Sequence, residues 1–272
     1  MTSDDLVLVG ALAVVVLAAT AVVPAFVDAR PAYEIPVNYE VDGETLERVD
    51  GEEWGEAPAA TIPVSSAGAD VPAAENTTVE QVTVEAVRTD DRLYLRLTWA
   101  DPSRDVSNDE IRTFTDAVAV QLPVNATARP PIAMGSPDNL VNVWYWAADD
   151  RTEELLAGGA GTTTEYSDPT VRTNATYEND RWKVVFSRPL EGSTANRTTV
   201  PTDEDMDVAF AVWNGGNMER SGQKAASEWY YLALGPGPAG PPYELILWTV
   251  AGVAIVVTTL VTIEGVRRTR GG

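Results

Sequence analysis

A period-two alternation of apolar and polar side chains runs through much of the chain between residues 79 and 234, and it limits the fold more than any other feature. TVEQVTVEAVRTDDRLYLRLTWAD contains two such segments, Val79 to Arg88 and Arg92 to Trp99, joined by a Thr-Asp-Asp turn. Five more lie in DAVAVQLPV, LVNVWYWAA, RWKVVFSRPL, DMDVAFAVWNGG and SEWYYLALG. Such alternation is typical of strands. SNDEIRTF predicts one helical turn, capped by Ser107 or Asn108. The pattern predicts an all-β domain, an antiparallel immunoglobulin-like β-sandwich.

Two apolar runs flank this region, Leu6 to Val27 and Leu245 to Ile263. Each reaches the ~20 residues that a helix needs to cross a bilayer. For the first run, a cleaved signal peptide is the alternative, because AFVDA offers small residues near a cleavage point. Its acidic start, MTSDD, and its length favour an uncleaved anchor. The sequence therefore predicts two transmembrane helices.

The tail EGVRRTRGG carries Arg267, Arg268 and Arg270, so the positive-inside rule places it in the cytoplasm. Two spans then put the N-terminus inside and residues 28 to 242 outside the cell membrane. Glycosylation sequons at Asn76, Asn125, Asn174 and Asn196 agree with that topology. We predict a cytoplasmic N-terminus at residues 1–5, a span at 6–27, a linker at 28–45, an extracytoplasmic sandwich at 46–234, a Pro/Gly spacer at 235–242, a span at 243–263 and a basic cytoplasmic tail at 264–272.

The charge balance is strongly acidic, with 41 Asp and Glu residues against 19 Lys and Arg residues and a formal net charge of -22. Such a surface repels nucleic acid, so nucleic-acid binding is excluded as a function. Lysine is rare, with only Lys183 and Lys224, while small Ala, Val and Thr residues are common. This pattern indicates a protein that works in high salt, and we expect a halophilic archaeal source.

The chain contains no Cys and no His. Disulfides, thiolate nucleophiles, iron-sulfur ligation and ordinary zinc sites are therefore excluded. A Ser-His-Asp triad, histidine acid-base catalysis and two-histidine haem ligation are excluded as well. Most enzyme classes thus lose their usual catalytic groups, and a haem within the predicted spans would lack its usual ligands.

Four stretches, in this order, resemble one known family: VEAVRTDDRLYLRLTWADPSRD, PPIAMGSPDNLVNVWYWAAD, DRWKVVFSRPL and VAFAVWNGGNMERSGQKAASEWYYLAL. They are similar to the haem-binding domain of the ethylbenzene dehydrogenase gamma subunit. The same domain forms the haem b subunit of type II enzymes of the dimethyl sulfoxide reductase family. EEWGEAPAATIPV, from Glu52 to Val64, resembles that domain's opening strand. The resemblance covers about residues 50 to 234.

The resemblance implies one b-type haem whose iron is bound axially by a methionine and a lysine. By position these are Met134 in AMGSPDN and Lys224 in SGQKAASEW. The composition agrees, because without His and Cys only Met, Tyr or a neutral Lys amine remains as a ligand for haem iron. A ligating Lys must lose its proton, so it needs an environment that lowers its pKa from about 10.4.

Alternatives to this ligand pair stay open in the sequence. Met134 beside a glycine is also typical of packing, and Met218 in GNMERSGQK is a competing methionine. Lys224 is otherwise read as a surface lysine, and Lys183 in DRWKVVF competes with it. The aromatic residues are by default core and edge residues. They are Trp144, Tyr145, Trp146, Trp213, Trp229, Tyr230 and Tyr231.

Three further side chains are candidates to contact the haem. Alternation sends Trp144 and Trp146 to one face of their strand and Tyr145 to the other, so the two tryptophans can line the haem together. Arg188 in SRPL can pair with a haem propionate by charge.

The resemblance implies an electron-transfer subunit that is not itself an enzyme. The family's partners are a molybdenum-cofactor catalytic subunit and an iron-sulfur subunit, and the haem relays single electrons between them and a quinone-linked or soluble carrier. Nitrate, chlorate or a sulfoxide is the expected substrate of such a complex. The alternative is a cell-surface carbohydrate-binding or adhesion β-sandwich without haem, which would not need the Met134 and Lys224 pair. A structural envelope protein is a third possibility.

Overall fold

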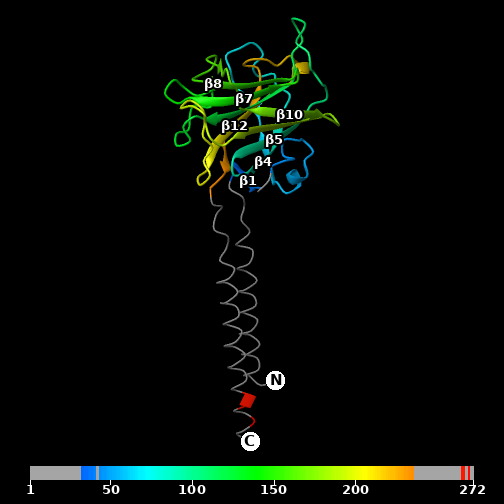
Figure 1. Cartoon of the computed structure of the whole chain (residues 1–272). Helices are drawn as coiled ribbons and strands as arrows, with labels where there is room; N and C mark the ends of the chain where they lie inside the picture. The colour runs from blue at the N-terminus through cyan, green and yellow to red at the C-terminus, as the bar shows by residue number, and fades with distance from the viewer. Residues whose placement is uncertain (1–31, 41–42, 236–264, 267–268, 270–272) are drawn as a thin grey trace, which may run out of the picture. The chain divides into compact units, whose positions relative to one another are not determined.

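The computed structural model describes residues 32–40, 43–235, 265–266 and 269, and residues 31–236 form one compact unit. The all-β prediction is confirmed for this unit (Figure 1). Its strands are β1 (Glu34–Tyr39), β2 (Ala59–Pro63), β3 (Ser65–Ser66), β4 (Gln81–Arg88), β5 (Arg92–Ala100), β6 (Ala117–Pro123), β7 (Val141–Ala147), β8 (Arg151–Ala157), β9 (Thr164–Glu165), β10 (Arg172–Tyr177), β11 (Arg181–Pro189), β12 (Met206–Trp213), β13 (Ala225–Ala226) and β14 (Tyr230–Ala233). Two short 3-10 helices, η2 (Glu52–Gly55) and η3 (Gly215–Asn217), accompany them.

The seven strands predicted from alternation correspond to β4, β5, β6, β7, β11, β12 and β14. The single helical turn predicted in SNDEIRTF is absent from the described structure, where Thr113 N–H donates to Glu110 O in a turn. Among the described residues no helix is long and apolar enough to cross a membrane. The predicted spans, residues 6–27 and 243–263, lie outside the described residues.

The strands form one curled sheet with two halves. Its order is β10-β11-β5-β4-β1-β14-β12-β6-β7-β8-β9, with β2 beside β4, β13 beside β12 and β3 beside β13. Apolar side chains from both halves pack together in an inner core, including Leu95 and Phe186 from one half and Val120, Trp144 and Phe210 from the other. This burial of one face from each half is what holds a sandwich together.

Strand β1 joins the two halves, although it lies within the residues that we predicted to be a linker. Glu34 pairs in parallel with Tyr231 of β14, and Tyr39 pairs in parallel with Arg88 of β4. The other pairings between described strands are antiparallel, so the prediction of a purely antiparallel sheet needs this correction. Alternation does not reveal β1, because only Ile35 of its six residues is buried.

Candidate functional site

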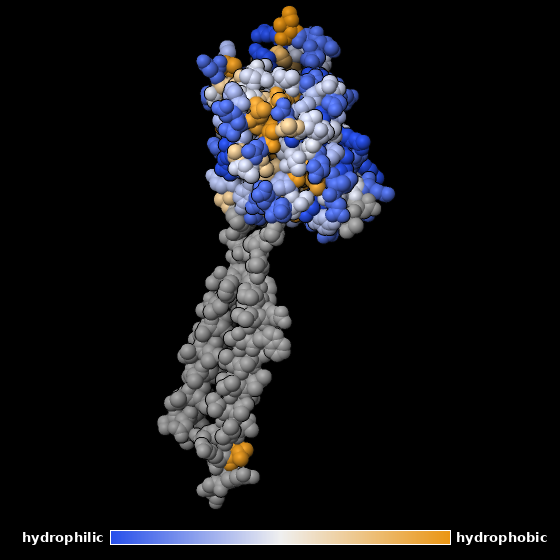
Figure 2. All heavy atoms as spheres, turned by 60° about the vertical axis from the view of Figure 1, so that its left-hand side comes forward, coloured by the Kyte–Doolittle hydropathy of each residue, from blue (hydrophilic) through white to orange (hydrophobic). Residues whose placement is uncertain are grey.

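The outer face of the half built from β12, β6, β7 and β8 carries a second apolar cluster, which we call the outer cluster. Its buried members are Ala119, Val141, Val143, Ala157, Ala209 and Trp229, and Met134, Tyr145, Leu155 and Trp213 pack against them. Small residues dominate its centre. This side of the domain comes forward in Figure 2, where a patch of hydrophobic residues is surrounded by hydrophilic ones. Large side chains, among them Tyr145, Trp213 and Trp229, cover these small residues.

The loop that carries Met134 is held in one conformation by its backbone. Met134 and Gly135 both have left-handed φ angles, of 65° and 74°. The Met134 N–H donates to Ile132 O at 2.8 Å, and its carbonyl accepts from Gly159 N–H at 2.8 Å. The Met134 side chain, partly buried, packs against the outer cluster. A non-glycine residue held at positive φ is uncommon, so the fold holds the backbone that carries this thioether at some conformational cost.

Lys224 reaches the same face from the segment before β13. In the register of β12 with β13, Val212 pairs with Ala225, which places Lys224 beside Trp213. Its Nζ lies 5.3 Å from the centroid of the Trp213 ring, and that ring belongs to the outer cluster. Burial lowers the pKa of the Lys224 amine. Among the described residues no carboxylate forms an ion pair with it.

The competing residues lie elsewhere. Met218 is 45% exposed at the end of η3 and does not belong to the outer cluster. Lys183 is on β11, in the other half of the sheet, where it pairs with Thr98 and Thr176. Met134 packs against the outer cluster, and Lys224 lies over Trp213, which packs against the same cluster, whereas Lys183 lies on the other half of the sheet.

Trp144 and Trp146 face away from the outer cluster. Both are buried in the inner core, where the Trp146 ring contacts those of Trp99 and Trp182, with centroids 6.5 and 5.0 Å away. As alternation predicted, the two tryptophans share one face of β7 and Tyr145 lies on the other. The face of the outer cluster, however, is the one that carries Tyr145. The structure therefore does not bring Trp144 and Trp146 together with Met134 and Lys224. Burial raises the pKa of Tyr145 to about 12, so this neighbour of the site stays neutral.

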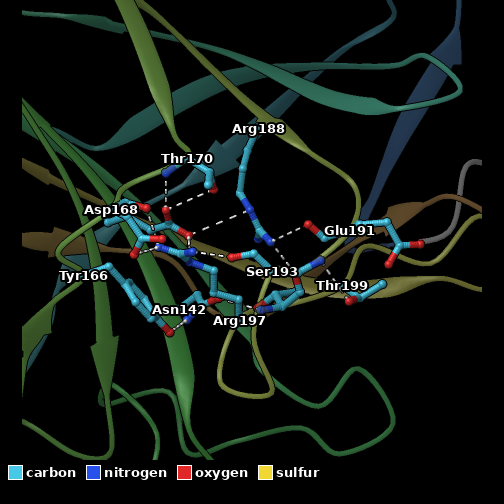
Figure 3. Close-up of polar contacts among 12 residues, drawn as sticks. Asn142, Tyr166, Asp168, Thr170, Arg188, Glu191, Ser193, Arg197 and Thr199 are labelled. Atoms are coloured by element: carbon cyan, nitrogen blue, oxygen red, sulfur yellow. Dashed lines mark hydrogen bonds and ion pairs between the residues drawn. The ribbon is translucent and has the colours of Figure 1, made fainter.

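Arg188 is fully buried inside the sheet, in the polar cluster drawn in Figure 3. Its Nε lies 3.8 Å from Glu154 Oε1, and its guanidinium donates to Thr198 O at 2.6 Å. Arg197 Nε lies 3.2 Å from the same Glu154 oxygen. Arg188 thus has a carboxylate partner within the protein, and it does not lie with Met134 and Lys224. Its guanidinium sits 5.7 Å from the Trp144 ring, on the inner side of the sheet.

Two residues of the site were not singled out from sequence. Trp213 and Trp229 were assigned by default to the core and edge, whereas both pack in the outer cluster beside the Lys224 and Met134 segments. Alternation along β12 assigns Trp213 to the face opposite Val212, and this is the only sequence signal that could have located either side chain.

The donor set fits a haem. A thioether and an amine that forms no ion pair with the described carboxylates both lie at the outer cluster, and both can bind haem iron without adding negative charge. Within the described residues no group of three or more His, Cys, Asp and Glu side chains could hold a metal ion.

Comparison with known proteins agrees with the family resemblance seen in the sequence. A family model described as ethylbenzene dehydrogenase matches residues 52–169 and 159–225. A Haloferax mediterranei protein provisionally named as a respiratory nitrate reductase heme subunit is 53% identical over 252 residues, which is 93% of this chain and 91% of that protein. The chlorate reductase subunit gamma of Ideonella dechloratans is 38% identical over 56% of this chain, and the dimethylsulfide dehydrogenase subunit gamma of Rhodovulum sulfidophilum is 33% identical over 60%. Each of these two matches spans 64% of the relative's length.

Among solved structures, a family 9 carbohydrate-binding module from Caldicellulosiruptor kristjanssonii in complex with glucose aligns with a TM-score of 0.46 and 15% identity. The alignment covers 77% of this chain and 99% of that one. At this level the likeness carries no argument about function.

Proposed function

The chain belongs to the ethylbenzene dehydrogenase family, and on that premise we propose that it is a haem b electron-transfer subunit of an extracytoplasmic molybdoenzyme complex. Relatives that are 33% to 53% identical are named as subunits of nitrate reductase, chlorate reductase and dimethylsulfide dehydrogenase. The observation that carries the proposal is that Met134 packs against the outer cluster and that Lys224 lies over Trp213 of the same cluster. Catalysis belongs to a partner subunit in this proposal.

Met134 and Lys224 would hold one haem b as its two axial ligands. When bound, the haem supplies a reversible one-electron centre. The thioether favours a raised reduction potential, and the neutral amine adds no charge to the iron. Lys224 suits this role because burial already disfavours its protonated form. With both axial positions taken by protein, the site would carry electrons and leave no open position for a substrate.

The partners follow from the resemblance and remain part of the proposal. They are a molybdenum-cofactor catalytic subunit, an iron-sulfur subunit and a quinone-linked or soluble carrier, with nitrate, chlorate or a sulfoxide as the substrate of the complex. We place the sandwich, of immunoglobulin-like type, outside the cell membrane between two spans, with both termini in the cytoplasm. The acidic composition supports an origin in a high-salt cell.

A carbohydrate-binding or adhesion module is the less favoured function. The named relatives are subunits of reductase and dehydrogenase complexes. Sugar binding also gives no reason for a lysine that forms no ion pair with the described carboxylates to lie at the same cluster as Met134.

Visible spectra of the oxidised and reduced full-length chain, expressed with haem, test the proposal. We expect low-spin haem b bands that Met134→Ala and Lys224→Ala each convert to a different ligation state. Met218→Ala and Lys183→Ala are the matched controls, because neither residue belongs to the outer cluster, and their spectra should equal that of the wild type. A protein that binds no haem would overturn the proposed function. Unchanged spectra in both ligand variants would overturn the ligand assignment.

A further inference from the structure

We infer that Trp213 and Trp229 are positioning residues, each of which fixes one of the two ligand-bearing loops to the outer face of the sheet. The inference rests on the proposed function for its link to haem. The contacts that carry it are present in the protein chain alone.

Trp229 holds the methionine loop. Its ring is buried in the outer cluster, with 7% exposed, and its indole N–H donates to Pro130 O at 3.0 Å. Pro130 lies four residues before Met134 in the connection between β6 and β7. Gln121 of β6 supports the same loop, because its side-chain amide donates to Ile132 O at 3.1 Å. The loop is thereby tied to the sheet on both sides of residue 131.

Trp213 holds the lysine loop in the same way. Its indole N–H donates to Ser221 O at 3.1 Å, three residues before Lys224, and its ring faces the Lys224 Nζ at 5.3 Å. The rings of Tyr145 and Trp213 pack edge to face at a centroid separation of 5.6 Å, which restrains the plane of the indole. One indole thus sets both the course of the loop and the surface against which the amine lies.

The two hydrogen bonds are chemically alike, and they act on different loops. Each consists of one indole N–H and one carbonyl, and they act on loops about 90 residues apart in sequence. A ligand loop that is fixed before cofactor binding loses less conformational entropy when it binds. Loss of one of these hydrogen bonds should therefore weaken the binding of one axial ligand to the iron and leave the binding of the other unchanged.

Trp54 provides a matched control on the other half of the sheet. Its indole N–H also donates to a loop carbonyl, Arg48 O at 3.0 Å, and a cation, Arg96, also lies over its ring at 4.8 Å. Phe in place of each tryptophan keeps one aromatic ring and removes the N–H donor together with the second ring, so W54F also controls for the lost volume. The set W213F, W229F and W54F thus deletes the same hydrogen bond at two ligand loops and at one remote site.

Two readouts follow for the full-length chain. In the haem-free protein, amide hydrogen exchange at residues 132–135 should speed up about two- to tenfold in W229F, and at residues 221–224 by a similar factor in W213F, as expected for loss of one hydrogen bond. In the haem-loaded protein, acid titration of the low-spin spectrum reports release of the lysine. Its midpoint should rise by up to about one pH unit in W213F, because a weaker amine ligand loses to protons at higher pH.

W229F should instead weaken the methionine-iron charge-transfer absorption and leave the lysine midpoint in place, and W54F should match the wild type in both readouts. If W213F and W229F behave like W54F while the wild type binds haem through Met134 and Lys224, the positioning roles are refuted and the proposed function stands. If neither the wild type nor any variant binds haem, the proposed function fails. Hydrogen exchange still decides whether the two tryptophans hold their loops, and unchanged exchange there refutes the inference.

Discussion

The Nζ of Lys224 lies 5.3 Å from the centroid of the Trp213 ring, with no carboxylate of the described residues in an ion pair with it. An aromatic face attracts a cation, whereas burial disfavours the charge. Burial is the dominant effect here, because the pKa of Lys224 is lowered. The haem-free protein therefore keeps a lysine whose charged form destabilises the fold.

Lys224→Met should stabilise the haem-free protein at pH 7 by on the order of 1 kcal/mol, because an uncompensated partly buried charge is removed. The folded state holds its Lys224 proton less tightly than the unfolded state, so the stability of the wild type should rise with pH as the unfolded value of 10.5 is approached. Lys224→Met should lose that rise. Urea unfolding between pH 7 and 10 measures both effects, with Lys183→Met as control. A loss of stability at pH 7 would contradict the expectation.

Glu154→Gln should destabilise the protein strongly, by about 3 to 5 kcal/mol, because it leaves two buried arginines without their shared carboxylate. Arg188, Arg197 and Glu154 have side chains that are 0% exposed, with Arg197 Nε 3.2 Å from Glu154 Oε1. Asp50→Asn removes a carboxylate that is 77% exposed and pairs with Arg48 at 3.2 Å, so it should cost less than about 1 kcal/mol. Denaturant unfolding compares the two variants, and equal losses would refute the role of burial.

Sequence patterns located the strands that bury a regular apolar stripe and missed those that do not. Strand β8, RTEELLA, was not predicted, because Glu153 and Glu154 precede Leu155 and Leu156 and no alternation is visible. Glu154 nevertheless points inward, where the two arginines compensate its charge. A buried charge that is neutralised by partners distant in sequence gives no local signal.

The ligand pair was predicted from the family resemblance, whereas the residues that surround it could be identified only from the fold. Alternation correctly grouped Trp144 with Trp146 and set Tyr145 apart, but it could not say which face the Met134 loop covers. That depends on a loop between strands crossing over the sheet. The partner of Arg188 was unpredictable for the same reason, because Glu154 is 34 residues away and pairs with it across the core.

Asp101 should make stability fall as pH rises toward neutrality. Burial, together with the negative charge of Asp116, raises the pKa of Asp101 from 3.8 to about 7. The folded state therefore holds a proton that the unfolded state releases between those values, so this contribution is complete below about pH 4 and is lost as pH rises through about 7. Asp101→Asn should remove the decline between pH 5 and 8, measured by urea unfolding at constant salt. Asp70→Asn, at an exposed position, should keep it. An equal decline in both variants would contradict the assignment of the pH dependence to Asp101.

Low salt should destabilise the protein, because a net charge of -22 repels itself. The range of that repulsion shrinks from about 10 Å at 0.1 M salt to about 3 Å at 1 M. The thermal midpoint should therefore climb by several degrees between 0.1 M and 2 M KCl, at about 2 to 4 °C for each 1 kcal/mol. A nonelectrolyte of equal osmolality should give a smaller rise. Equal rises with both solutes would show that charge screening is not the cause.

Gly135→Ala should disturb the methionine loop more than Gly161→Ala does, although both glycines have nearly the same left-handed φ, 74° and 77°. Any side chain at these angles is strained by about 1 kcal/mol. A Cβ at Gly135 would also lie 2.5 Å from Asn139 O, whereas nothing lies within 4 Å of one at Gly161. Gly135→Ala should therefore lower the thermal midpoint further and reduce the low-spin share of bound haem, because the residue directly after Met134 must shift. Gly161→Ala should lower the midpoint slightly and leave the spectrum unchanged. Identical behaviour of the two variants would show that the close approach at Asn139 does not set the position of Met134.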